Sequence, residues 1–250
     1  MNFLKKAIFG AATALVFSGA AFASPVNVDG VIWNAGADFT GINVTLTETI
    51  DPSSGALSGF GVITSLNGQG ASSFCPGCQL TVQYSGYTPV SGGVLPSPTG
   101  NGTQIAYQGG QINIFVHHDN DLNPNDPLSL NAGNTGGDLW LTLEGHAING
   151  VTLTGSNFFP SFLFGSGLWD VTGGAGSAYL NTNTKQDGAD FSFSNTFTSF
   201  PGTPDTPSSP LFSVGSGTFQ GNSIPEPGSM ALVGLGLLAA GALRRRQASK

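Results

Sequence analysis

Short runs in which apolar and polar residues alternate constrain the fold of this chain more than any other feature. Residues 42–47 (INVTLT), 111–117 (QINIFVH) and 139–145 (LWLTLEG) each place an apolar side chain at every second position. A period of two residues is typical of a strand that buries one face. The central part of the chain has no sustained helical period, so the alternation favours strands throughout it.

Further apolar segments are separated by glycine, proline and asparagine, and Asn67-Gly68 is a strong hairpin signal. These candidate strands are 60–66, 80–84, 151–153, 162–164, 168–171, 178–180, 191–197 and 211–219. Many short strands with regular turns are typical of an all-β domain. We therefore predict an antiparallel β-sandwich or jelly roll over residues 24–221. A parallel β-helix is the alternative, although no repeat of fixed period is visible.

The charges of this central body are almost all negative. Six of the seven Lys and Arg lie near the two ends of the chain, which leaves Lys185 against thirteen carboxylates and a formal charge of −12. Such a surface repels nucleic acid and anionic lipid headgroups, so we exclude both as partners of the body. Hydrophobic residues make up 39% of the chain, which is enough to build a core.

Residues 1–23 have the pattern of a secretory signal peptide. Lys5 and Lys6 precede an uncharged stretch at 7–21, which ends in Ala21-Phe22-Ala23. A basic start, an apolar middle and a small-x-small end are what a signal peptidase recognises. We expect cleavage after Ala23, with an uncleaved anchor as the alternative.

The segment at 222–250 has a second apolar run, at 230–243, without a charged side chain. As a helix it would cover about 21 Å, less than the roughly 30 Å of a bilayer's hydrocarbon layer. Three arginines follow it, and positive charge is retained at the cytoplasmic end of a membrane segment. We predict a short transmembrane helix over 230–243. The residues that flank it are Pro225, Glu226 and Pro227 before the run and Arg244, Arg245 and Arg246 after it.

This ordered set, at about 224–247, resembles the PEP-CTERM sorting signal of bacterial exported proteins. The resemblance implies export across the inner membrane by the secretion machinery and recognition by an exosortase, a membrane-bound cysteine transpeptidase that removes the tail. It also implies transient anchoring in the membrane, followed by a location at the cell surface or outside the cell. An ordinary C-terminal anchor with a chance Pro-Glu-Pro is the alternative.

The two cysteines, Cys75 and Cys78, form a Cys-Pro-Gly-Cys sequence. In an oxidising compartment we expect them to pair as a structural disulfide across the Pro-Gly turn. A redox-active pair is the alternative, but such pairs begin a helix, and here an alternating strand at 79–84 follows. A zinc site would need two further ligands that no second such motif supplies.

The densest group of polar residues lies at 117–126. Carboxylate and amide oxygens recur there at alternate positions, as in calcium loops. The candidate ligands are Asp119, Asp121, Asn123, Asn125 and Asp126. Pro124 and Leu130 stand where an EF-hand requires Gly and Glu, so an EF-hand is not expected. An Asx-rich turn without a cation is the alternative.

No set of residues with the spacing of a known catalytic machinery is apparent. His117 and His118 are adjacent, so a strand would direct them to opposite faces. Glu144 and His146 share a face but have no nucleophile near them in sequence. Trp140 and Trp169 fall within apolar strand segments, where core positions are expected.

We therefore expect an exported, non-catalytic surface or extracellular-matrix protein that is processed by an exosortase and associated with exopolysaccharide. A calcium- or carbohydrate-binding module is the first alternative. The second is a hydrolase of envelope polymers, which would require a cleft with an unusually protonated carboxylate.

Overall fold

A computed structural model of the protein describes residues 25–34, 38–51, 53–90, 103–118, 137–158, 162–199, 211–224, 234–238, 240–241 and 244. The predicted signal peptide at 1–23, the candidate calcium ligands at 119–126, Pro225 to Pro227 and the arginines at 245 and 246 lie outside these residues. Within the described part of the chain, no helix has the length and apolar character needed to cross a membrane.

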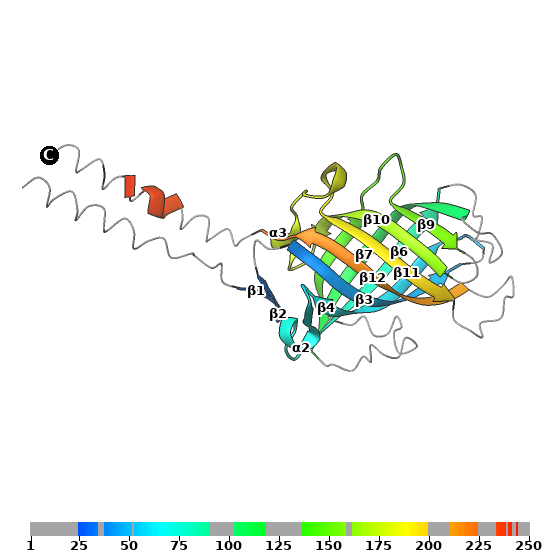
Figure 1. Ribbon diagram of the computed structural model, residues 1–250, viewed down its shortest axis with the longest axis horizontal. Helices are drawn as coiled ribbons and strands as arrows, with labels where there is room; N and C mark the ends of the chain where they lie inside the picture. Colours follow the sequence, from blue (N-terminus) through cyan, green and yellow to red (C-terminus); the bar gives the residue numbers. More distant parts are fainter. Residues whose placement is uncertain are drawn as a thin grey trace, which may run out of the picture.

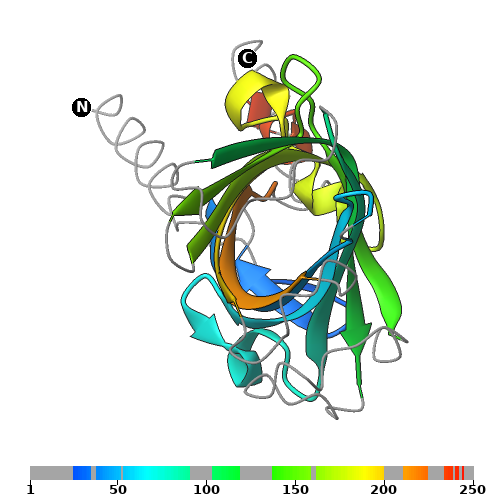
Figure 2. The same cartoon turned by 90° about the vertical axis from the view of Figure 1, so that its right-hand side faces the viewer.

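Ten strands form one antiparallel sheet in the part of the chain that the structure describes. They are β3 (Asp38–Ile50), β4 (Leu57–Leu66), β5 (Gln69–Gly70), β6 (Gln79–Pro89), β7 (Thr103–His117), β8 (Asp138–Gly145), β9 (Leu153–Phe158), β10 (Phe162–Gly173), β11 (Phe191–Ser199) and β12 (Leu211–Asn222). The order is β11-β12-β3-β4-β6-β7-β8-β10, and β10 pairs with β11. The sheet therefore closes on itself, as the view along its axis shows (Figure 2).

Strands β8 and β9 share one position in this ring, between β7 and β10. Residues 103–107 of β7 pair with β9, while residues 111–116 of the same strand pair with β8. On the other side, β10 pairs with β9 through residues 162–167 and with β8 from Trp169 onward. The connection at 146–152 therefore interrupts the wall of the sheet at a single place.

The predicted all-β, antiparallel body is confirmed. The arrangement of its strands differs in one respect from that of a sandwich or jelly roll. Those folds divide their strands between two packed sheets, whereas hydrogen bonding here continues around the whole ring. The alternation of apolar and polar residues could not distinguish the two, because each strand buries one face in either arrangement. The pairing of β12 with β3 joins the last and the first strand of this sheet, and the pairing of β10 with β11 completes the ring.

Aromatic rings fill the interior. The ring of Trp169 lies 4.9 Å from that of Phe193 and 5.7 Å from that of Phe219, measured between centroids. Its indole Nε1 donates a hydrogen bond of 2.7 Å to the hydroxyl oxygen of Tyr87. On β12, the strand next to that of Phe193, a Cβ on Gly217 would lie 2.5 Å from Phe193, so only glycine leaves room for that ring.

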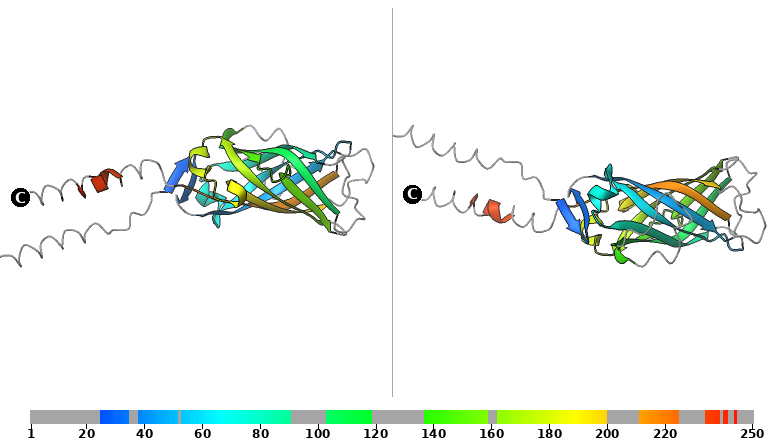
Figure 3. Two further views of the ribbon diagram at one scale, coloured as in Figure 1. Left: turned by 90° about the horizontal axis from the view of Figure 1, so that it is seen from above. Right: turned by 90° about the horizontal axis from the view of Figure 1, so that it is seen from below.

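One end of the closed sheet is covered by a hairpin, β1 (Pro25–Val28) and β2 (Val31–Asn34), seen beside the ring in Figures 1 and 3. Trp33 of this hairpin makes edge-to-face contacts with Phe39, Trp140 and Tyr179 at 5.7 to 5.8 Å. The Nε1 of Trp140 donates to the carbonyl oxygen of Val28 at 3.2 Å. We call the end of the sheet that this hairpin covers the plugged end. Trp140 and Trp169 are both buried, as predicted.

Short helical turns lie in the connections: α2 (Ala71–Phe74), α3 (Ser177–Leu180) and η3 (Gln186–Gly188). Residues 178–180 were predicted as a strand, and this was wrong, because they belong to α3. A helix of one turn is too short to show a helical period in the sequence. The Asn67-Gly68 turn is present with positive φ at both residues (50° and 74°), although β5 beyond it has only two residues.

Candidate functional site

The outer face of strands β9 to β12 carries a regular array of hydroxyl groups. Because aromatic residues, glycine, Leu153 and Asn195 occupy the inward positions of these strands, the alternate positions point outward. We call the outward group the hydroxyl face; its members are Thr154, Ser156, Ser166, Ser194, Thr196, Ser216 and Thr218. Ser166 pairs with Thr154 on one side and Ser194 on the other, and Ser194 pairs with Thr218, so the hydroxyls form rows across the strands.

The hydroxyl face is hollowed into a shallow groove of about 430 Å³, which we call the hydroxyl groove. Phe164 also lines it and is 42% exposed, although its ring is large and apolar. Its cross-strand neighbours are Ser156 and Thr196. Phe164 thus lies between two hydroxyl-bearing residues on the neighbouring strands.

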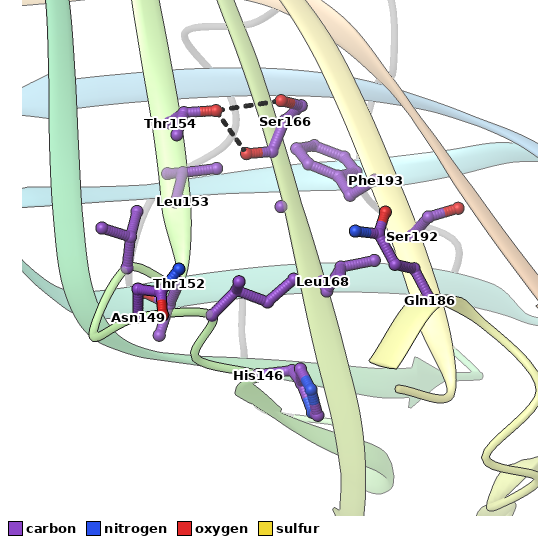
Figure 4. A pocket seen from close by; sticks show the side chains of 13 residues that line it. His146, Asn149, Thr152, Leu153, Thr154, Ser166, Leu168, Gln186, Ser192 and Phe193 are labelled. Carbon is purple, nitrogen blue, oxygen red and sulfur yellow. Dashed lines mark hydrogen bonds between the residues drawn. The ribbon is translucent and has the colours of Figure 1, made fainter. Parts of the chain in front are cut away.

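A second groove of about 530 Å³ lies where the connection at 146–152 interrupts the wall (Figure 4). We call it the histidine groove. Leu153, Leu168 and Phe193 contribute apolar surface to it, and polar side chains surround them. These polar residues are His146, Asn149, Thr152, Thr154, Ser166, Gln186 and Ser192.

Thr154 and Ser166 line both grooves, so the two grooves adjoin at this pair of residues. The Oγ1 of Thr154 lies 3.0 Å from the Oγ of Ser166 and donates to the Ser166 carbonyl oxygen at 3.2 Å (Figure 4). These contacts hold the two side chains in fixed positions at the boundary between the grooves.

His146 is held by a carboxylate from a neighbouring strand. Its Nδ1 lies 2.9 and 2.8 Å from the two carboxylate oxygens of Asp170, and its Nε2 lies 3.9 Å from Oδ2 of Asp187. A carboxylate at one ring nitrogen fixes the orientation of an imidazole. Both of these described partners of His146 are carboxylates, and neither is a hydroxyl or a thiol.

Sequence reasoning placed His146 with Glu144 on one face and missed Asp170. The partner lies 24 residues further along the chain. The pairing of β8 with β10 brings it beside Glu144, its direct cross-strand neighbour. Knowledge of the strand order would have been needed to find this contact.

The interior of the sheet holds polar groups but little free space. The cavity lined by Tyr84, Trp169 and Asn195 measures only about 20 Å³, room for one water molecule. Burial raises the pKa of Tyr107 to about 12, and the charge of Glu48 adds to the effect. Burial likewise raises the pKa of Tyr84, with Glu48 again contributing. The space among these side chains is too small for a larger ligand.

The other predicted site residues that the structure describes do not line either groove. Cys75 and Cys78 are buried and lie at disulfide distance, with Cα atoms 5.1 Å apart, as the Cys-Pro-Gly-Cys sequence predicted. Among the described residues, no three His, Cys, Asp or Glu side chains are grouped as metal ligands. The calcium site at 119–126 lies outside those residues and stays a prediction. Arg244 is helical and exposed.

Comparison with known proteins informs on one segment of the chain. No curated protein and no solved structure matches the chain. Residues 223–246 match the family model of the PEP-CTERM protein-sorting motif. The tail with Pro225, Glu226, Pro227 and the arginines is therefore a PEP-CTERM sorting motif, as its sequence predicted.

Proposed function

We propose that this protein is an exported, non-catalytic surface or extracellular-matrix protein that an exosortase processes and that associates with exopolysaccharide. The sorting motif at 223–246 implies export and exosortase processing. The hydroxyl face carries the proposal for the body, because its Ser and Thr side chains can both donate and accept hydrogen bonds with the hydroxyls of a polysaccharide.

The charge of the body also supports this assignment. Charged residues are only 8% of the chain, so a surface of hydroxyls and amides takes their place. Such a surface offers few ion pairs to a protein partner but many hydrogen bonds to a hydrated polymer.

The sorting part is tested by deleting residues 225–246 in a host that contains an exosortase. We expect the intact mass of the deletion variant to differ from that of the processed wild-type protein, and we expect the variant to be absent from the cell surface. An unchanged intact mass and location would contradict exosortase processing.

The binding part is tested by affinity electrophoresis of the mature protein in gels containing exopolysaccharide from the same host. We expect slower migration than in a gel without polymer. Release of reducing ends during the incubation would instead indicate a hydrolase, and unchanged migration would contradict the association.

A further inference from the structure

We propose that the hydroxyl groove and the histidine groove form one continuous binding site for an uncharged glycan chain, with Phe164 as the surface on which a sugar ring stacks. The inference rests on the proposed function, since both concern polysaccharide, but it assigns the surface and the ligand class. The two can fail separately, because the surface can be altered while the rest of the body is left intact.

The continuity of the grooves sets the size of the ligand. They meet at Thr154 and Ser166, and together they extend from His146 on the β8–β9 connection to Ser216 and Thr218 on β12. The combined path crosses four neighbouring strands. A cavity for one small molecule would be compact and enclosed, whereas an open path of this length suits several units of a polymer.

The charge of the lining sets the ligand class. Among the described residues that line the two grooves, His146 is ionisable and none is Asp, Glu, Lys or Arg. A polyanion would gain no strong cationic partner from these residues and would be repelled by a body of formal charge −12. The carboxylates near this described lining, those of Asp170 and Asp187, lie beside His146 at one end of the histidine groove, so a polycation would find no carboxylate along the rest of the described path. The groove chemistry therefore selects an uncharged ligand rich in hydroxyls.

Phe164 explains why that ligand is a sugar. A pyranose has an apolar face of C–H groups and an edge of hydroxyls, so it matches an aromatic ring that is surrounded by hydrogen-bonding groups. Phe164 is 42% exposed and has Ser156 and Thr196 as direct cross-strand neighbours. The surrounding hydroxyls sit on strands and not on loops, so little conformational entropy is lost on binding.

The histidine groove gives the site a polar end. Asp170 fixes the ring of His146, and Gln186 and Ser192 also line this groove. Leu168 and Leu153 between them offer apolar contact to another sugar ring. The two ends thus differ, with a histidine at one and only neutral side chains at the other.

The experiment compares Phe164→Ala with Leu139→Ala in the mature protein. Leu139 is a matched control, because it is a 45% exposed apolar residue on β8 and lines neither groove. The probes are dextran, cellohexaose, the host exopolysaccharide and, as an anionic comparison, polygalacturonate. We expect Phe164→Ala to bind the neutral probe about tenfold more weakly, as for loss of a stacked ring, and Leu139→Ala to bind like the wild type.

A second, independent variant combines Thr154→Val with Ser166→Ala, with Thr88→Val on β6 as its control. Removing the two shared hydroxyls should weaken binding about fivefold without changing the melting temperature. This variant keeps the test informative if Phe164→Ala does not fold.

The outcomes separate the two proposals. Wild-type binding to the host polymer with undiminished binding by both groove variants would overturn the site and leave the proposed function standing. Preferred binding of polygalacturonate would overturn the ligand class. Absence of binding to every probe, the host exopolysaccharide included, would overturn the proposed function, and the site with it.

Discussion

The inner and outer faces of strands β10, β11 and β12 differ more than any other two regions of the molecule. The inner face holds Trp169, Phe193 and Phe219 packed against each other, with Gly217 leaving room for a ring. The outer face of the same strands holds Ser and Thr. Because side chains alternate along a strand, one segment supplies both the core and the proposed binding surface. The comparison indicates that stability depends on one face and binding on the other.

The largest expected effect is that of Trp169→Ala. The substitution removes a fully buried ring and leaves a cavity among Phe193, Phe219 and Tyr87. We expect the free energy of unfolding to fall by about 3–5 kcal/mol in a urea titration. A loss below about 1 kcal/mol would show that Trp169 is not closely packed against Phe193 and Phe219.

A methyl group at Gly217 should be the next most harmful change. Its Cβ would lie 2.5 Å from Phe193 and 3.0 Å from Leu46, so these two side chains must move. We expect Gly217→Ala to cost about 1–3 kcal/mol. The control is Ser216→Ala on the outer face of the same strand, expected within about 0.5 kcal/mol of wild type. Equal effects at both positions would remove the distinction between the faces.

Tyr87→Phe tests a single hydrogen bond of the inner face. The variant keeps the ring but leaves the buried Nε1 of Trp169 without its acceptor at 2.7 Å. We expect a loss of about 1–3 kcal/mol in the free energy of unfolding, the cost of an unsatisfied buried donor. An unchanged midpoint in the same urea titration would mean that Trp169 finds another acceptor.

The inner face should also respond to alkaline pH. The pKa of Tyr107 is raised to about 12 by burial, above the ordinary value near 10 that it has in the unfolded chain. The folded protein then binds more protons than the unfolded one, so stability is full below pH 10 and falls as pH rises toward 12. Melting temperatures between pH 8 and 12 measure the decline, and Tyr107→Phe should reduce it.

The smallest effect is expected for Thr196→Ala on the outer face. Its side chain lies in the hydroxyl groove and contributes nothing to the core. We expect a change within about 0.5 kcal/mol in the free energy of unfolding. A larger loss would show that the hydroxyl rows also stabilise the sheet.

Much of the strand content could be predicted from the sequence, because each long strand has one buried face. The alternation at 111–117 and 139–145 lies in β7 and β8, and the hairpin signal at Asn67-Gly68 marks a real turn. Closure of the sheet could not be predicted, since it depends on pairing between its first strand, β3, and its last, β12, which lie far apart in the sequence. The hairpin β1–β2 was also missed, because its apolar residues cover an end of the sheet and follow no clear period.

Less of the candidate site could be predicted. Trp140 and Trp169 were assigned to the core correctly, but the hydroxyl face was not recognised as a surface. Serine and threonine are abundant in this chain, so no single one stands out until the register aligns them. The same holds for His146 and Asp170, whose contact depends on the pairing of β8 with β10.

The position of the plugged end has a consequence for how the protein is displayed. The N–H of Ile224 donates to the carbonyl oxygen of Tyr179 at 2.9 Å, the ring of Tyr179 contacts Trp33, and Trp33 pairs with Val26. The first and last described residues of the body therefore both lie at the plugged end. Strand β12 runs one residue past the predicted boundary at 221, and the Pro-Glu-Pro follows Ile224 without a spacer. Attachment through that segment would hold the body by its plugged end and leave both grooves on its side.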